Sequence, residues 1–231
     1  MKRRSTTASL ALLASLAAGS SLAFSACGAG ASSSLASESP KAIVNSAANA
    51  ISKASSVHLD ASGSSNGQKL GINMELFKSG DIDGTLSIAG HSFQIVIANG
   101  GAYLKADLSF WESSASVPPA LAKKLANKWV KAPSASNLGV NSFSMKSLAT
   151  SLRHPGGGLS KGGIKTIDGE SAISIKAKGH GTLWVASSGT PYPVEIDSFG
   201  SAPGKASLTR WNLGTLPTVP KGALNLAGLA G

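Results

Sequence analysis

Cysteine is almost absent from this chain of 231 residues, in which Cys27 is the only one. A single thiol excludes an intramolecular disulfide, a cysteine-based zinc ribbon and a dithiol redox centre. Aromatic residues make up 5% of the chain, so stability must come mainly from buried aliphatic side chains. Acidic residues are also few, 11 against 21 Lys plus Arg, and the formal net charge is +10. This basic balance predicts either anionic neighbours or a solvating surface, and nucleic acid is not expected because no Arg/Lys run is interleaved with aromatics.

The first 27 residues are typical of an export signal. A basic start, Met1 to Arg4, precedes an apolar stretch from Ala8 to Ala23 that is short for a membrane span. Phe24 to Cys27 then resembles the bacterial lipobox, in which the cysteine receives a diacylglyceryl group and the chain is cut before it. We therefore expect residues 1–26 to be removed and Cys27 to be the lipid anchor. The alternative is an ordinary secretory signal cut after Ala26, which would leave a free N-terminal thiol.

One domain is expected after this signal. Residues 27–39 form the lipidated N-terminus and a Gly/Ala/Ser tether, whose twelve residues from Gly28 span about 20 Å as a flexible coil. Residues 40–231 form the domain, because this length fits a single core. A helix of about fifteen residues is predicted to start it, with Ser39 as N-cap and Pro40 at its first position.

Alternating apolar and polar residues predict strands from Ser56 onward. Five short strands are expected up to Leu108, with a hairpin at Asn99-Gly100 and the last strand over 103–108. Helical spacing returns after Pro118 and again over 144–153. Further strands are predicted over 164–167, 171–177, 182–186, 193–197 and 205–211. An antiparallel sheet with one apolar face accounts for this order.

No catalytic, metal or cofactor site is predicted. The four histidines do not stand at metal-ligand spacing, and no Gly-x-Ser-x-Gly elbow occurs. His154 precedes Pro155 and three glycines, but this run follows a helix, unlike the oxyanion loop of esterases. Asp81 and Asp83 fit a β-turn better than a carboxylate pair. The expected protein is therefore not an enzyme.

Several segments, taken in order, carry a resemblance to a known family. They are the motif at Cys27, Ala54 to Leu59, Ala102 to Lys105, Lys128 to Pro133, Lys165 to Glu170, Ile173 to Ile175 and Trp211 to Gly214. Together they resemble the LppX/LprG-like lipoproteins of actinobacteria, which share an open half-barrel with the LolA and LolB carriers. The resemblance implies an α+β fold, a curved antiparallel β half-barrel packed on a few helices, with an apolar cavity for the acyl chains of lipids or glycolipids.

The apolar residues on the predicted strands and helices are the cavity candidates, although each also fits an ordinary core. They are Val57, Leu59, Ile72, Met74, Leu76, Leu86, Ile88, Phe93, Ile95, Ile97, Leu104, Leu121, Leu125, Leu148 and Leu152. The leading hypothesis is a monomeric lipoprotein, held on the extracytoplasmic face of the cell membrane, that binds acyl lipid or glycolipid for transfer or envelope assembly. A membrane transporter is then a candidate partner. The alternatives are a structural or partner-binding lipoprotein with a filled core and, third, an envelope hydrolase.

Overall fold

The structure is a computed structural model and describes residues 35–65, 67–113, 117–133, 140, 143–198 and 203–225. Cys27 and the leader lie outside these ranges, so the anchor and the cleavage site stay predictions. In the part of the chain that is described, no helix is long and apolar enough to cross a membrane.

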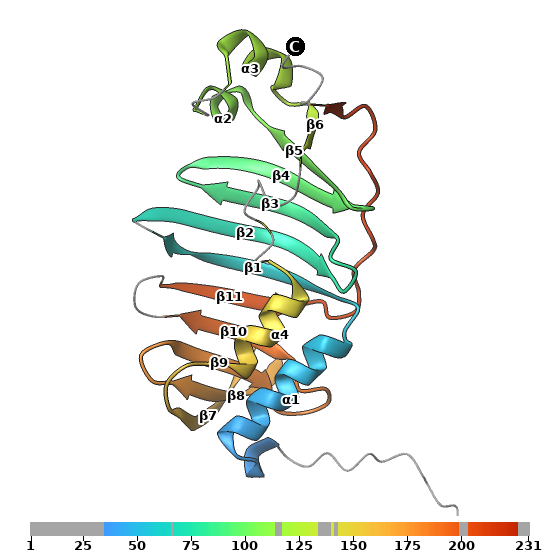
Figure 1. Ribbon diagram of the computed structural model, residues 1–231. Coiled ribbons are helices and arrows are strands. Elements are labelled where there is room, and N and C mark those ends of the chain that lie inside the picture. The colour runs from blue at the N-terminus through green and yellow to red at the C-terminus, as the bar shows by residue number, and fades with distance from the viewer. Residues whose placement is uncertain are drawn as a thin grey trace, which may run out of the picture. The chain divides into compact units, whose positions relative to one another are not determined.

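One 12-stranded sheet forms the framework of a mixed α+β fold (Figure 1). The strands are β1 (Ser56–Ser65), β2 (Gln68–Phe77), β3 (Ile82–Ile88), β4 (His91–Ala98), β5 (Gly101–Ala106), β6 (Trp129–Ala132), β7 (Leu159–Ile167), β8 (Glu170–Ala177), β9 (Gly181–Ala186), β10 (Pro193–Ser198), β11 (Gly204–Thr209) and β12 (Leu224–Asn225). Their order is β12-β6-β5-β4-β3-β2-β1-β11-β10-β9-β8-β7, and all neighbours are antiparallel except β12 beside β6. The predicted fold class is confirmed.

The helices among the described residues pack on one face of this sheet, here called the inner face (Figure 1). They are η1, a 3-10 turn (Leu35–Ser37), α1 (Pro40–Lys53), α2 (Leu108–Ser113), α3 (Pro119–Leu125) and α4 (Met145–Arg153). The predicted start of α1 is confirmed, because the Ser39 hydroxyl accepts a hydrogen bond of 3.2 Å from the Ala42 N–H and Pro40 follows it. Ser144 caps α4 in the same way, at 3.0 Å from the Ser147 N–H.

Tight two-residue turns connect three of the hairpins. Ala89 and Asn99 have φ of 53° and 51° and are each followed by a glycine that also has positive φ, and the Asp168–Gly169 turn has the same form. Two positive φ values in succession define the type I′ turn, whose twist matches that of the flanking strands. The hairpin expected at Asn99-Gly100 is therefore confirmed.

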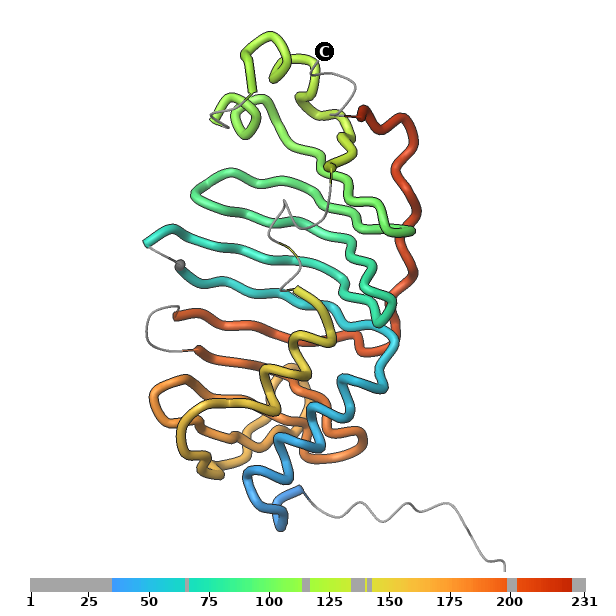
Figure 2. The backbone as a smooth tube through the Cα atoms, in the orientation of Figure 1, coloured from blue at the N-terminus to red at the C-terminus, as the bar shows by residue number. Residues whose placement is uncertain are grey.

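Strands β1 and β11 join the two meanders of the sheet, although they lie far apart in the sequence. They pair antiparallel with Leu59 opposite Leu208 and Ala61 opposite Ala206. After β11 the chain runs along the strand ends from β1 to β6, as the tube in Figure 2 shows, and adds β12 as an edge strand beside β6. Asn212 pins the start of this C-terminal segment, because its Oδ1 accepts from the Ser55 N–H at 2.7 Å.

A continuous apolar core fills the inner face of β2 to β6. Phe93 packs on Phe110 at 5.0 Å between ring centroids, and Phe110 meets Trp111 edge-on at 5.3 Å. Leu125 of α3 is fully buried against the same cluster. A second cluster joins the N-terminal half of α1 to β8 and β9, through Ile43, Val44 and Ile175 among others.

Two expectations about element boundaries are wrong. The strand predicted over 103–108 ends at Ala106, because Asp107 caps α2 by accepting a 2.9 Å hydrogen bond from the Phe110 N–H, a contact that also lowers the pKa of the Asp107 carboxyl. The strand predicted over 205–211 likewise ends early, at Thr209. Before α1, Leu35 is buried against residues of α1 and β8, and Lys161 donates from Nζ to the Ala36 and Glu38 carbonyls.

Candidate functional site

The fifteen cavity candidates all lie on strands or helices that face the inner side, but they differ in exposure. Nine are buried within the main core cluster: Val57, Ile72, Met74, Leu76, Leu86, Phe93, Ile95, Leu104 and Leu125. Five are partly buried against it: Leu59, Ile97, Leu121, Leu148 and Leu152. Ile88, at the end of β3, is 40% exposed and outside the cluster. Most of the candidates therefore pack against other side chains of the protein.

A hollow opens instead where the two meanders meet. It has a volume of about 290 Å³ and lies on β1, β2, β10 and β11 near the β10–β11 connection. Its lining is mostly apolar and includes Ala61, Leu70, Ile72, Ile196, Pro203 and Ala206. Small residues make this space, because Ala61 and Ala206 face each other across the β1–β11 pair where larger side chains would meet.

A second hollow of about 210 Å³ adjoins the first, and the two share Ile196 and Ser198. It lies between α1, α4 and strands β8 to β10, with Val44, Leu148, Leu152, Leu159, Ile175 and Leu183 in its walls. We call the two hollows together the inner groove. Two of the predicted candidates on α4, Leu148 and Leu152, and one on β2, Ile72, line this groove.

Polar groups of the groove lie around its apolar walls. Ser151, His180 and Asp197 are lining residues, but no hydrogen bond joins them to one another in the described structure. A nucleophile and its base would be joined in this way. The arrangement can therefore hold an apolar chain and place a polar end near these side chains.

An ion-pair network supports the groove from the outer face of β10. Glu195 is 4% exposed and accepts hydrogen bonds from Lys205 at 2.6 Å and Lys165 at 3.1 Å. Burial alone would raise the pKa of Glu195, but the hydrogen bonds from Lys205 and then Lys165 outweigh it and lower the pKa. The same bond to Glu195 raises the pKa of Lys205, and Lys165 also lies 4.1 Å from the ring centroid of Trp184. These contacts join β7, β9, β10 and β11 on the face of the sheet opposite the groove.

Sequence reasoning missed most of the groove residues, including the large aliphatic side chains of Leu70, Ile175 and Leu183. Ala61, Pro203 and Ala206 are small or lie at a strand end, and Ile196 belongs to a strand with a register shift between Pro193 and Glu195. One signal in the sequence could have indicated the groove, namely the Ser/Gly/Ala-rich composition of Ala61 to Ser64 and Ser198 to Ala206. Small side chains on a strand leave unfilled space over that part of the sheet.

Solved structures with the same fold include two mycobacterial proteins. LprF from Mycobacterium bovis matches with a TM-score of 0.58 and 13% sequence identity, covering 80% of this chain and 97% of LprF. The lipoprotein LppX from Mycobacterium tuberculosis matches with a TM-score of 0.52 and 16% identity, covering 76% of this chain and 96% of LppX. No protein-family model and no curated protein matches the sequence. The chain therefore has the LppX/LprF-like fold, and the resemblance stated from the sequence is confirmed at the level of fold.

Proposed function

We propose that this protein is a membrane-anchored lipoprotein on the extracytoplasmic face of the cell membrane, and that it carries the acyl chain of a lipid or glycolipid in the inner groove. The observation that carries the proposal is the contrast between the two halves of the sheet. The part from β3 to β6 is filled by its own side chains, whereas an apolar hollow remains over β1, β2, β10 and β11. The fold shared with the lipoprotein LppX adds support.

The size of the groove suits part of a lipid molecule. Pockets that bind small ligands commonly have volumes of about 300–1,000 Å³, and the larger hollow has about 290 Å³. Each methylene that leaves water contributes about 0.8 kcal/mol, so ten methylenes contribute about 8 kcal/mol before the cost of association. A chain held in this way can still leave, because transfer to a bilayer returns a similar free energy.

Binding without catalysis is the function that the groove chemistry favours. Its walls are apolar, and its polar lining residues Ser151, His180 and Asp197 are not arranged as a hydrogen-bonded catalytic set among the described residues. We infer a carrier that moves lipid during transfer or envelope assembly.

Native mass spectrometry tests the proposal. The chain is purified from its host under non-denaturing conditions, and the organic extract is analysed for acyl lipids in parallel with the intact complex. About one lipid per protein supports the carrier function. A folded, stable protein without lipid favours a structural or partner-binding lipoprotein, and recovery of cleaved lipid products indicates a hydrolase.

A further inference from the structure

A second cleft lies at the strand ends where β8 to β11 meet the start of the C-terminal segment, and it extends onto the outer face of β1 to β3. One part, of about 520 Å³, is bounded by the Asp168–Gly169 turn, the β9–β10 loop and residues 208–213. The other, of about 320 Å³, lies over β1, β2 and β3 beside the C-terminal segment. Arg210 lines both parts, so we treat them together as the outer cleft.

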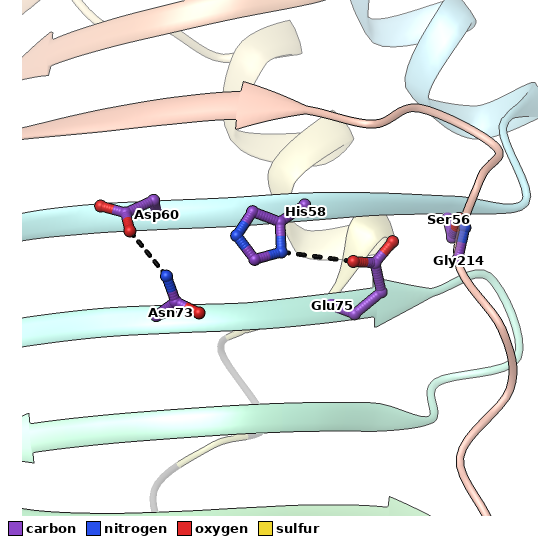
Figure 3. A network of polar contacts seen from close by, with 6 residues as sticks. All are labelled: Ser56, His58, Asp60, Asn73, Glu75 and Gly214. Atoms are coloured by element: carbon purple, nitrogen blue, oxygen red, sulfur yellow. Dashed lines mark hydrogen bonds and ion pairs between the residues drawn. The ribbon is translucent and has the colours of Figure 1, made fainter.

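The outer cleft is separate from the inner groove in two respects. Along β1, His58 near the first residue lines the outer cleft, whereas Ala61 to Ser64 near the last residue line the inner groove. Figure 3 shows His58, Asp60, Asn73 and Glu75 on the face opposite the helices. A ligand in one site therefore leaves the other free.

An aromatic pair, partly buried against the main core, lines the larger part of the cleft. Tyr192 and Trp211 stack with ring centroids 4.4 Å apart and planes inclined by 5°. Trp211 Nε1 donates to the Pro193 carbonyl at 3.2 Å, and Asn212 Nδ2 donates to the Tyr192 hydroxyl at 2.8 Å. Both rings are thus held in place before any ligand arrives. Amphipathic aromatics of this kind pair apolar faces with polar surroundings.

Charged side chains line both parts of the cleft without forming ion pairs with one another. Asp168 and Glu170 line the larger part, Asp83 lines the smaller part and Arg210 lines both. None of the four takes part in an ion pair within the described ranges, where the ion pairs belong to Glu75 and Glu195. Carboxylates accept strong hydrogen bonds from hydroxyl groups, and a guanidinium donates to hydroxyl or ring oxygens. Carboxylates outnumber the single arginine, which disfavours an anionic ligand such as phosphate.

The smaller part of the cleft has a closely built wall. Gly214 N donates to Ser56 Oγ at 2.8 Å, and a Cβ at Gly214 would lie 2.6 Å from Glu75 Oε1 (Figure 3). Glu75 Oε2 in turn lies 3.3 Å from His58 Nδ1, and Asn73 donates to Asp60 at 2.7 Å. These contacts fix the polar side chains at the floor while His58, Asn73 and Asp83 still line the space.

From this combination we propose that the outer cleft binds a neutral sugar chain. Sugar rings present apolar C–H faces to an aromatic surface and hydroxyl groups to carboxylates, amides and guanidinium, and the outer cleft offers each of these. The chain can come from a wall polysaccharide or from the headgroup of a neutral glycolipid. The site would let the protein hold on to envelope glycans while the inner groove carries lipid, but it does not depend on the groove being occupied.

Titration with defined sugars tests this site on the purified full chain in detergent. The probes are maltotetraose, cellotetraose, mannotetraose and chitotetraose. Their binding is measured by saturation-transfer NMR and by calorimetry. The test variant combines Glu170→Gln with Arg210→Gln, and the matched control combines Glu112→Gln with Lys124→Gln on exposed positions of α2 and α3. We expect at least one probe to bind, with affinity reduced tenfold or more in the test variant and unchanged in the control. Glu170→Gln alone, at an exposed position, replaces the double variant if that does not fold.

Vesicles distinguish the two sources of the sugar. Vesicles of monogalactosyl diacylglycerol are compared with phosphatidylcholine vesicles for binding to the same proteins. Binding of free tetrasaccharides assigns the site to polysaccharide, and binding only to the galactolipid vesicles assigns it to a glycolipid headgroup. The proposal is overturned if neither the tetrasaccharides nor the galactolipid vesicles bind, or if the test variant binds as well as the control. It is also overturned if the cleft instead binds a polycation, so that spermine binds, loses affinity on Glu170→Gln, and no sugar binds.

Discussion

Replacing Ala61 by Phe distinguishes a lipid groove from an ordinary core at one position. Ala61 lines the larger hollow opposite Ala206, so the new ring should occupy space that a ligand uses. If the ring displaces about four methylenes, the affinity for the acyl chain falls by about 3 kcal/mol, or about two hundredfold. Thermal stability of the ligand-free protein should change little, because the ring enters an existing space.

Ala106→Phe is the matched control, since it makes the same chemical change on the same face of the sheet. Ala106 is 3% exposed and lies opposite Phe93 in the filled core. Overpacking there should cost about 1–3 kcal/mol, and each kcal/mol lowers Tm by about 2–4 °C in a domain of this size. Calorimetric melting of delipidated protein and mass spectrometry of copurified lipid give the two readouts. The reasoning is refuted if Ala61→Phe lowers Tm as much as Ala106→Phe, or if it leaves the lipid content unchanged.

Three further predictions concern the anchor, the ion-pair network and the C-terminal segment. Cys27→Ala should move the protein to the aqueous phase in detergent phase partitioning, because stable anchoring needs two or more acyl chains and only the Cys27 thiol can take the diacylglyceryl group that carries two of them. Persistence in the detergent phase would point to a retained leader. The lowered pKa of Glu195 means that its ion pairs stabilise the fold above its ordinary pKa of 4.5 and that this contribution is lost as pH falls through the folded-state pKa. Between pH 7 and pH 3, Tm should therefore fall less steeply with pH for Glu195→Gln than for the parent protein. Parallel plots of Tm against pH for the two proteins would contradict a stabilising role of the network. Asn212→Gly keeps the positive φ of 64° but removes the bonds to Ser55 and Tyr192, so unfolding free energy should fall by about 1–2 kcal/mol in urea, and an unchanged midpoint would show that the C-terminal segment is held elsewhere.

Local signals in the sequence predicted the elements well where the chain itself supplies the partners. Ser39 caps a helix that begins one residue later, and Asn99-Gly100 forms a turn between adjacent strands. Helix α2 was missed because Leu108 continues the alternating pattern of β5, whereas the deciding contact is the side chain of Asp107. A capping aspartate was thus the signal that outweighed periodicity.

The position of the groove could not be predicted in the same way. It depends on the pairing of β1 with β11 and on where α1 and α4 lie on the sheet, and these contacts join residues far apart in the sequence. Ile95 shows the consequence, since its alternation is correct but its side chain is fully buried in the core and lines neither part of the groove. Hydrophobic periodicity indicates which face is inner, and only the three-dimensional arrangement indicates which inner residues remain uncovered.

Contacts between a bound acyl chain and individual methyl groups test the central claim most directly. The full chain, with methyl-labelled Ala and Ile, is loaded with a lipid whose acyl chain is isotopically distinguishable, and intermolecular NOEs are recorded in detergent that is fully deuterated. The account predicts NOEs from chain methylenes to Ala61, Ala206 and Ile196, which line the groove, and none to Ile95, which is buried in the core. NOEs to Ile95 without contacts to the other three residues, or no NOEs from a lipid that copurifies with the protein, would contradict it.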